Sequence, residues 1–290
     1  MTVLAPTRWE DALAERAARP DAVPIAGGTD LMVAVNAGRL RPEALLDLTR
    51  VAALAEWGRS DGRLRIGAGV TYARLVREVA ALAPGLAAAA RTVGSPQIRA
   101  RGTVGGNLGS ASPAGDCHPP LLAAGAVVEV ASVRGTRRLP VGDFFAGVKR
   151  SVLASDELVI AVEMPVAPGP QEFAKVGTRN AMVIAVCSVA VGLDPAARTL
   201  GTGLGSVAPT PVRARAAEEY VAAELADRGL WESRGQLPDV VGLRFGELVA
   251  AAAAPIDDVR GTAAYRRHAV AVLGRRVLAR AWREYGGSVG

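Results

Sequence analysis

The segment Ile25-Ala26-Gly27-Gly28-Thr29-Asp30-Leu31 decides how the first part of the chain is interpreted. A short apolar run ends at Ile25, two glycines follow, and a helical pattern begins at Asp30 with Leu31, Met32 and Val35. A strand that turns through Gly-Gly into a helix presents unpaired backbone N–H groups and the positive end of a helix dipole at one point. Glycine also lets the backbone approach an anion without a Cβ in the way. A segment of this kind can hold a pyrophosphate.

A second glycine pair occurs in Thr103-Val104-Gly105-Gly106-Asn107, within a glycine-rich stretch that runs on to Asp116. We expect the same backbone concavity here, with hydroxyl and amide side chains added. A single Gly-Gly is more often only a tight turn, but two such segments flanked by polar donors favour a ligand. Neither is a Walker loop, because Gly-Lys-Ser/Thr occurs nowhere, and neither is the Rossmann Gly-x-Gly-x-x-Gly. Gly201-x-Gly203-x-Gly205 comes closest, inside a predicted strand.

The 290 residues are enough for one large or two ordinary domains. Half of them are hydrophobic but only 4% are aromatic, so the core must be built largely from Ala, Val and Leu. The net charge of +6 comes from arginine, because Lys149 and Lys175 are the only lysines. The densest basic stretch runs from Arg260 to Arg283, mostly within a predicted terminal helix. It indicates a solvated face or a partner-subunit surface rather than a nucleic-acid site.

Cysteine content and apolar runs indicate where the protein works. The only cysteines are Cys117 and Cys187, which argues against a disulfide framework and fits a reducing cytoplasm. Arg8, Glu10 and Asp11 precede any long apolar run, so no secretion signal is predicted. The longest strongly apolar segment, 181–193, is shorter than the roughly 20 residues that a membrane-spanning helix needs. We therefore expect a soluble, cytoplasmic protein.

The order of predicted elements favours an α+β fold in two parts. Up to about Pro170, short strands alternate with helices: strands over 23–25, 44–48, 64–66, 126–130 and 157–164, and helices from Asp30, over 72–82 after the cap Thr71, over 84–92 and over 120–124. Three prolines within 165–170 indicate a boundary. Beyond it, strands over 172–176, 182–192 and 200–207 precede helices over 212–225, 245–254 and 265–282. Strands followed by helices are typical of an α+β unit.

The two glycine segments resemble the FAD-pyrophosphate loops of the molybdenum hydroxylase flavoprotein family, which includes the medium subunits of carbon monoxide dehydrogenase and xanthine dehydrogenase. The resemblance covers essentially the whole chain in order, through Ala111-Ser112-Pro113-Ala114-Gly115-Asp116, the strand 156–165, Phe173-Ala174-Lys175 with 182–185, and Gly261-x-x-x-Tyr265-Arg266. It implies a two-lobed PCMH-type FAD-binding domain of the vanillyl-alcohol-oxidase superfamily over 1–170. A small α+β C-terminal domain over 171–290 would follow.

The resemblance also implies which residues bind FAD, without a covalent bond. Asp116 would lie close to the flavin nucleotide, and the strand with Val159 would pass the isoalloxazine. Lys175 would place a fixed positive charge near the ring and stabilise its anionic reduced form. Asn36 stands where many relatives carry a lysine, which puts one electrostatic contact in doubt. The expected cofactor-binding residues are Ala26, Gly27, Gly28, Thr29, Asp30, Leu31, Thr103, Val104, Gly105, Gly106, Asn107, Asp116, Val159 and Lys175.

Several of these residues also have a simpler interpretation. Lys175 is alternatively a surface lysine on a strand, and Thr29 and Asn107 are alternatively caps of turns. Cys117 and His118 invite a metal or nucleophile interpretation, but the chain has only two cysteines and two histidines, and they lack ligand spacing. Neighbours on a strand also point to opposite faces, so we expect a structural role for this pair and no metal site.

The resemblance implies an oxidoreductase component that needs no catalytic acid–base pair of its own. A molybdopterin-binding large subunit would oxidise the substrate, and [2Fe-2S] clusters on a small subunit would pass electrons to FAD on this chain. The FAD would then reduce an external acceptor. No iron–sulfur or molybdopterin segment is recognisable, so those centres are expected only on the partner subunits. The alternatives are a stand-alone flavin-dependent oxidase and a non-enzymatic scaffold subunit that has lost its flavin.

Overall fold

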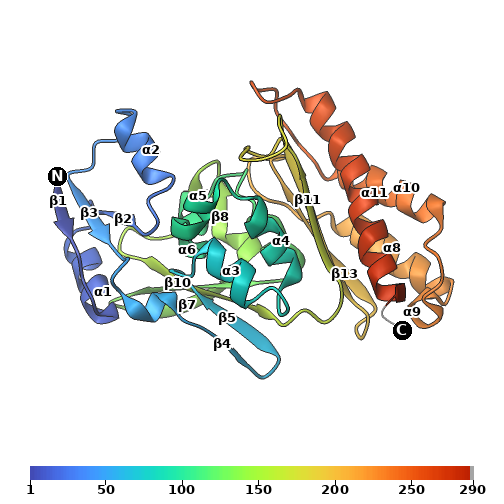
Figure 1. Ribbon diagram of the computed structural model, residues 1–290, viewed down its shortest axis with the longest axis horizontal. Coiled ribbons are helices and arrows are strands. Elements are labelled where there is room, and N and C mark those ends of the chain that lie inside the picture. The colour runs from blue at the N-terminus through green and yellow to red at the C-terminus, as the bar shows by residue number, and fades with distance from the viewer. Residues whose placement is uncertain (288–290) are drawn as a thin grey trace.

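The first lobe is a small parallel sheet with two helices, at the left of the computed structural model in Figure 1, which describes residues 1–287. Its strands lie in the order β1-β3-β2, with β3 parallel to both neighbours. The edge strand β2 leads directly towards the first glycine segment. The elements are β1 (Thr2–Leu4), α1 (Trp9–Ala18), β2 (Val23–Ile25), α2 (Leu31–Asn36) and β3 (Ala44–Asp47).

The second lobe is a five-stranded antiparallel sheet in the order β4-β5-β10-β6-β7. Residues alternate across it, so Leu64 and Ile66 are buried, whereas Arg65 faces outward and pairs with Glu129 on β6. The strands are β4 (Trp57–Ser60), β5 (Arg63–Gly67), β6 (Val127–Ser132), β7 (Gly135–Pro140) and β10 (Leu158–Pro165), after the 3-10 turn η1 (Ala52–Ala55). The turn η2 (Val141–Phe144) and the ribbon of β8 (Phe145–Gly147) and β9 (Arg150–Ser151) complete this side.

Five short helices gather between the sheet and the last part of the chain (Figure 1). They are α3 (Tyr72–Glu78), α4 (Pro84–Thr92), α5 (Pro96–Arg101), α6 (Val104–Ser110) and α7 (His118–Ala123). Thr71, Ser95 and Thr103 cap three of them, because each side-chain oxygen accepts a hydrogen bond from a backbone amide of the first turn. These short, capped helices present the loops of the candidate site.

The last part is a three-stranded antiparallel sheet covered by helices. Its strands lie in the order β11-β12-β13, and α11 packs against β11 and β12 (Figure 1). It has a hydrophobic core separate from that of the first two lobes, built around Phe245, Val270 and Trp282. The elements are β11 (Gln171–Val176), β12 (Cys187–Asp194), β13 (Thr199–Gly205), α8 (Arg215–Asp227), α9 (Leu230–Ser233), α10 (Asp239–Ala251) and α11 (Ala263–Gly287).

The strand β13 packs against α7 through glycines, so no side chain separates the two backbones. We call this contact the seam between β13 and α7. A Cβ added at Gly201 would lie 2.9 Å from the carbonyl carbon of Ala123, and one at Gly203 would lie 2.6 Å from that of Pro119. Both distances are below the 3.0 Å at which real Cβ contacts begin, and in each case the carbonyl oxygen lies closer still. The glycine motif over 201–205 is therefore a packing device between two backbones, not a nucleotide loop.

The predicted strands and helices are largely confirmed, and the differences fall into two kinds. The helix α6 lies in the glycine-rich stretch, and eight further strands and α-helices have no counterpart among the predicted ones: β1, β4, β7, β8, β9, α1, α5 and α9. The helix expected to reach residue 82 ends at Glu78. The strand expected from Met182 begins only at Cys187, because Arg179 binds the Met182 carbonyl oxygen in a loop. Over residues 1–287, no helix combines the length and apolarity needed to cross a membrane.

Candidate functional site

The first glycine segment turns from β2 into α2 and leaves its backbone amides free. Within residues 1–287, the N–H groups of Gly27, Gly28, Thr29, Asp30 and Leu31 donate no hydrogen bond. Gly28 has a φ of 73°, in the left-handed region that glycine adopts at little cost. Five consecutive free amides at the start of a helix form a concentration of positive partial charge. The predicted strand, Gly-Gly turn and helix are confirmed, and their chemistry suits an anion.

The fold brings the two glycine segments side by side. A Cβ at Gly27 would clash with the backbone of Arg101 and would lie 2.9 Å from the Cα of Gly102, just before Thr103. Only glycine permits this approach. Two segments far apart in the sequence therefore share one backbone contact.

The second glycine segment differs from the concavity that we expected. Thr103 Oγ1 accepts a hydrogen bond from the Gly106 amide (3.0 Å), while the Val104 and Gly105 amides donate to the carbonyl oxygens of Val70 (3.1 Å) and Ala68 (2.8 Å). These amides are therefore already satisfied within the protein. What α6 offers instead is a bare surface, because Gly106 and Gly109 are exposed and a Cβ at Gly109 would meet nothing within 4 Å. A helix face without side chains admits a flat or extended ligand closely.

A buried ion pair connects Asp116, two residues before α7, to Lys175 on β11 of the C-terminal sheet. Lys175 Nζ lies 2.6 Å from Asp116 Oδ2, and both side chains are only 9% exposed. Within the described chain, Asp116 Oδ1 is buried and has no hydrogen-bond partner. Burial raises the pKa of the Asp116 carboxyl, against the opposing effect of the Lys175 ammonium. Lys175 is thus no surface lysine, and the simpler interpretation of this residue is wrong.

Asn107 of α6 and His118 of α7 are both buried, and they meet between the two helices. The Asn107 side chain is 9% exposed, and its Oδ1 has no partner in the part of the chain that the structure describes. The ring of His118 donates from Nε2 to the Asn107 carbonyl oxygen (3.1 Å) and lies 4.7 Å from the ring of Phe145. Burial lowers the pKa of His118 to about 4, so the imidazole is neutral at neutral pH. His118 ties α6 to the start of α7.

Cys117 and His118 begin a helix, so our argument from a strand was wrong for this pair. Cys117 is the residue before α7 and His118 is its first residue. Burial raises the pKa of the Cys117 thiol, which keeps it protonated and a poor nucleophile. Over residues 1–287, no three His, Cys, Asp or Glu side chains gather in a way that could hold a metal ion.

Val159 is buried in a strand that contacts α6, and it does not lie on an open surface. It is buried in β10, where the pairing with β6 shifts register between Val159 and Ala161. The Ile160 carbonyl oxygen accepts a hydrogen bond from the Ala68 amide (2.8 Å), and Ala68 in turn accepts from Gly105. A chain of backbone hydrogen bonds therefore connects this strand to α6. Asn36, the last residue of α2, is exposed.

Together these groups fit a dinucleotide such as FAD. The free amides of the first segment match a pyrophosphate, and the bare face of α6 leaves room for an extended ligand. Asn107 Oδ1 and Asp116 Oδ1, which are among the buried side-chain atoms without partners, call for hydrogen-bond donors, which the hydroxyl and N–H groups of FAD supply. The fit follows from the donor and acceptor chemistry of the described residues.

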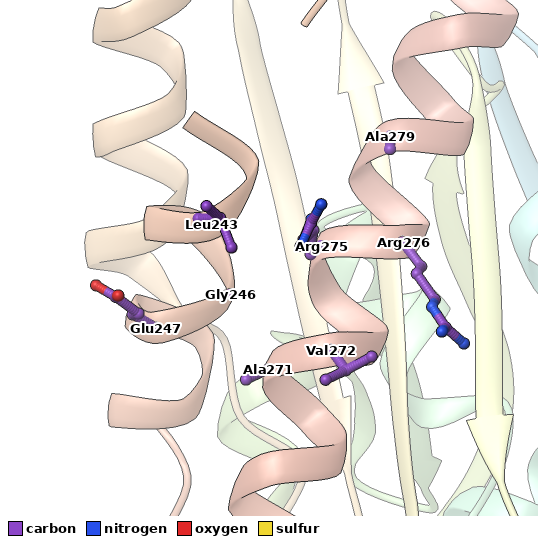
Figure 2. Close-up of a pocket in the computed structure, with 8 residues that line it drawn as sticks. All are labelled: Leu243, Gly246, Glu247, Ala271, Val272, Arg275, Arg276 and Ala279. Atoms are coloured by element: carbon purple, nitrogen blue, oxygen red, sulfur yellow. The ribbon is translucent and has the colours of Figure 1, made fainter. Parts of the chain in front are cut away.

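A groove between α10 and α11 is a separate feature. It has a volume of about 460 Å³ and an apolar floor that includes Leu243, Ala271 and Val272. Figure 2 shows Arg275 between the two helices, with Glu247 and Arg276 pointing away on either side. None of the residues expected to bind FAD lines this groove.

Comparisons with known proteins identify the family. Residues 1–167 match the FAD-binding domain of molybdopterin dehydrogenase, and residues 172–281 match the C-terminal domain of the CO dehydrogenase flavoprotein. The chain belongs to the FAD-binding subunit family of the molybdenum hydroxylases. The predicted family, the α+β fold class and the role as an FAD-binding oxidoreductase subunit are confirmed.

Similar proteins cover nearly the full length of the chain. The putative xanthine dehydrogenase FAD-binding subunit XdhB of Escherichia coli is 31% identical over 96% of this chain and 95% of its own length. The nicotine 6-hydroxylase medium subunit of Paenarthrobacter nicotinovorans is 31% identical over 95% of each chain. Among solved structures, a chain of quinoline 2-oxidoreductase from Pseudomonas putida 86 superposes with a TM-score of 0.88 at 26% identity, covering 98% of this chain and 97% of its own. A chain of the Cu,Mo-CO dehydrogenase gives 0.88 at 28%, covering 98% of each.

Proposed function

We propose that this chain holds one FAD non-covalently between the first glycine segment, the bare face of α6 and the Asp116–Lys175 pair. The observation that carries the proposal is the row of free amides from Gly27 to Leu31, packed against the residues that lead into α6. When bound there, FAD supplies redox chemistry that accepts and releases electrons singly or in pairs. The work of this chain is to bind and orient the cofactor and to leave one edge accessible.

Each predicted residue has a task in this arrangement. The amides from Gly27 to Leu31, with the turn that Ala26 enters, would hold the pyrophosphate, and the Thr29 hydroxyl would add a donor. Thr103 and Val104 anchor α6 so that Gly105 and Gly106 stay close to the ligand. Asn107 and Asp116 would accept hydrogen bonds, and Val159 would support α6 from behind.

The domain boundary near residue 170 is also part of the proposal. We assign residues 1–170 to the FAD-binding domain and residues 171–290 to the C-terminal domain. The three prolines within 165–170 support this division, as do the two hydrophobic clusters, of which the first takes only Phe173 and Ala190 from beyond residue 170. The side-chain-free seam between β13 and α7 would keep the two domains in fixed register.

Electrons would reach this chain from other subunits. A [2Fe-2S] cluster needs four Cys or His ligands close together, and over residues 1–287 no three His, Cys, Asp or Glu side chains gather in a way that could hold a metal ion. We therefore place the iron–sulfur clusters on a small subunit and molybdopterin on a large subunit, as the relatives named medium subunit or medium chain suggest. The two free thiols also support a cytoplasmic location.

The test is a titration of the purified chain with FAD, followed in the visible spectrum and by hydrogen exchange. We expect about one flavin per chain, released unchanged by acid, and slower exchange at the amides from Gly27 to Leu31. A folded chain that stays colourless, alone and in the assembled complex, contradicts the proposal and favours a scaffold. Turnover of an alcohol or amine by the isolated chain favours the stand-alone oxidase.

A further inference from the structure

All three hydrogen-bond donors of the Lys175 ammonium are already engaged inside the protein. A lysine ammonium has three N–H groups and no acceptor. Nζ lies 2.6 Å from Asp116 Oδ2, 2.9 Å from the Thr92 carbonyl oxygen and 3.1 Å from the Val183 carbonyl oxygen. No donor is left for a flavin, and the positive charge is compensated by a carboxylate at contact distance.

Asp116, in contrast, has one carboxylate oxygen that accepts no hydrogen bond within the described chain. Asp116 Oδ2 faces Lys175 and, at 3.5 Å, the Thr92 hydroxyl, whereas Oδ1 is buried without a partner in the described chain. A buried carboxylate oxygen without a donor is costly, so a ligand that supplies a donor there gains free energy. The pair therefore presents an acceptor to the candidate site rather than a positive charge.

We propose that Lys175 is a positioning residue, which fixes the Asp116 carboxylate so that Oδ1 accepts a hydrogen bond from an O–H or N–H group of FAD. This inference rests on the proposed function and changes the role expected for Lys175, which would not stabilise the reduced ring by direct contact. Its three anchors come from the end of α4, the residue before Cys117, and the β11–β12 loop. Through these hydrogen bonds, Lys175 connects the FAD-binding domain to the C-terminal sheet beside the cofactor.

A double-mutant cycle of Lys175→Met and Asp116→Asn tests this role. The measurements are FAD affinity, by flavin fluorescence quenching, and the flavin midpoint potential of the loaded variants. If Lys175 acts only through Asp116, Lys175→Met weakens FAD binding at least tenfold in the natural background. In the Asp116→Asn background the same change alters affinity less than threefold and leaves the midpoint potential unchanged.

The opposite results overturn the inference. Equal losses of affinity from Lys175→Met in both backgrounds, or a potential that falls equally in both, mean that the lysine acts on the flavin directly. Should Lys175→Met alone not fold, the comparison of Asp116→Asn with the double variant still decides, because the double variant leaves no unpaired buried charge.

Two controls separate this inference from the proposed function. Arg244→Met removes one positive charge from an exposed residue of α10, outside the proposed FAD site, and should leave FAD affinity unchanged. If the natural chain itself fails to bind FAD, the proposed function fails and the inference fails with it. If the natural chain binds FAD but the cycle is additive, only the positioning role is refuted.

Discussion

Adding one methyl group to the seam between β13 and α7 should destabilise the protein, whereas adding it one strand away should not. Gly201 pairs with Gly192 across β12 and β13, and both lie near the same Ala123 carbonyl. A Cβ at Gly192 would lie 3.8 Å from that oxygen, in ordinary contact. At Gly201 it would overlap the oxygen so far that the backbones must separate by about 1 Å.

The structure sets the size of the effect. Neither glycine has a positive φ, so alanine is not strained by its backbone conformation. Forcing atoms into a packed interior costs about 1–3 kcal/mol, whereas a compatible Gly→Ala change stabilises by about 0.4–1 kcal/mol through the unfolded chain. For a protein of this size, Gly201→Ala should lower the melting temperature by roughly 2–5 °C. Gly192→Ala should leave it equal or slightly higher.

Thermal unfolding followed by circular dichroism measures both variants under identical conditions. Because Asp116 directly precedes the first turn of α7, FAD affinity should fall with Gly201→Ala as well. The reasoning about the seam is refuted if Gly201→Ala melts with the natural chain. It is equally refuted if the two alanine variants lose the same stability.

Three further predictions concern the glycine segments and the buried histidine. Gly27→Ala should weaken FAD binding about tenfold or more in a fluorescence titration, because its Cβ would overlap the Arg101 carbonyl and separate the two segments; unchanged affinity would contradict the shared contact. Thr103→Ala and Ser95→Ala each remove a helix N-cap and should each cost about 1 kcal/mol in denaturant unfolding, but only the change at Thr103 should lower FAD affinity. The pKa of His118 falls from 6.5 to about 4 on folding, so the unfolded chain binds the proton more readily. Stability should then decline by up to about 3 kcal/mol as pH falls from 6.5 to 4. His118→Phe should flatten that part of the profile in unfolding experiments across pH, and an unaltered slope would assign it to other groups.

Local sequence signals predict much of the fold, and the exceptions have physical causes. The turn from β2 into α2 follows from two glycines between an apolar run and a helical pattern. The helix α6 is not predictable from propensity, because glycine costs about 1 kcal/mol relative to alanine at each interior position. The Thr103 cap and the backbone contacts of Gly105 with Ala68 offset this cost, and those contacts exist only in the folded chain.

The candidate site was predictable in its members but not in their connections. Asp116 and Lys175 were expected near the flavin by resemblance, yet their pairing, at 59 positions apart in the chain, depends on how two domains pack. The buried state of Lys175 and the unpaired Asp116 Oδ1 are likewise tertiary properties. The role of the glycines in β13 follows only from the position of α7.

The chain contains only two lysines, so a reagent that reacts with amines can modify it selectively. Lys175 is buried with all three donors of its ammonium engaged, so of the two lysines only Lys149 is accessible to amine-directed reagents. Lys149 follows β8, and its amide binds the Ala111 carbonyl at the end of α6 (3.1 Å). A fluorophore or cross-linker attached there would sit beside the bare glycine face at a defined position. The natural sequence thus allows near single-site labelling without mutagenesis, for distance measurements to bound flavin or for mapping the partner subunits.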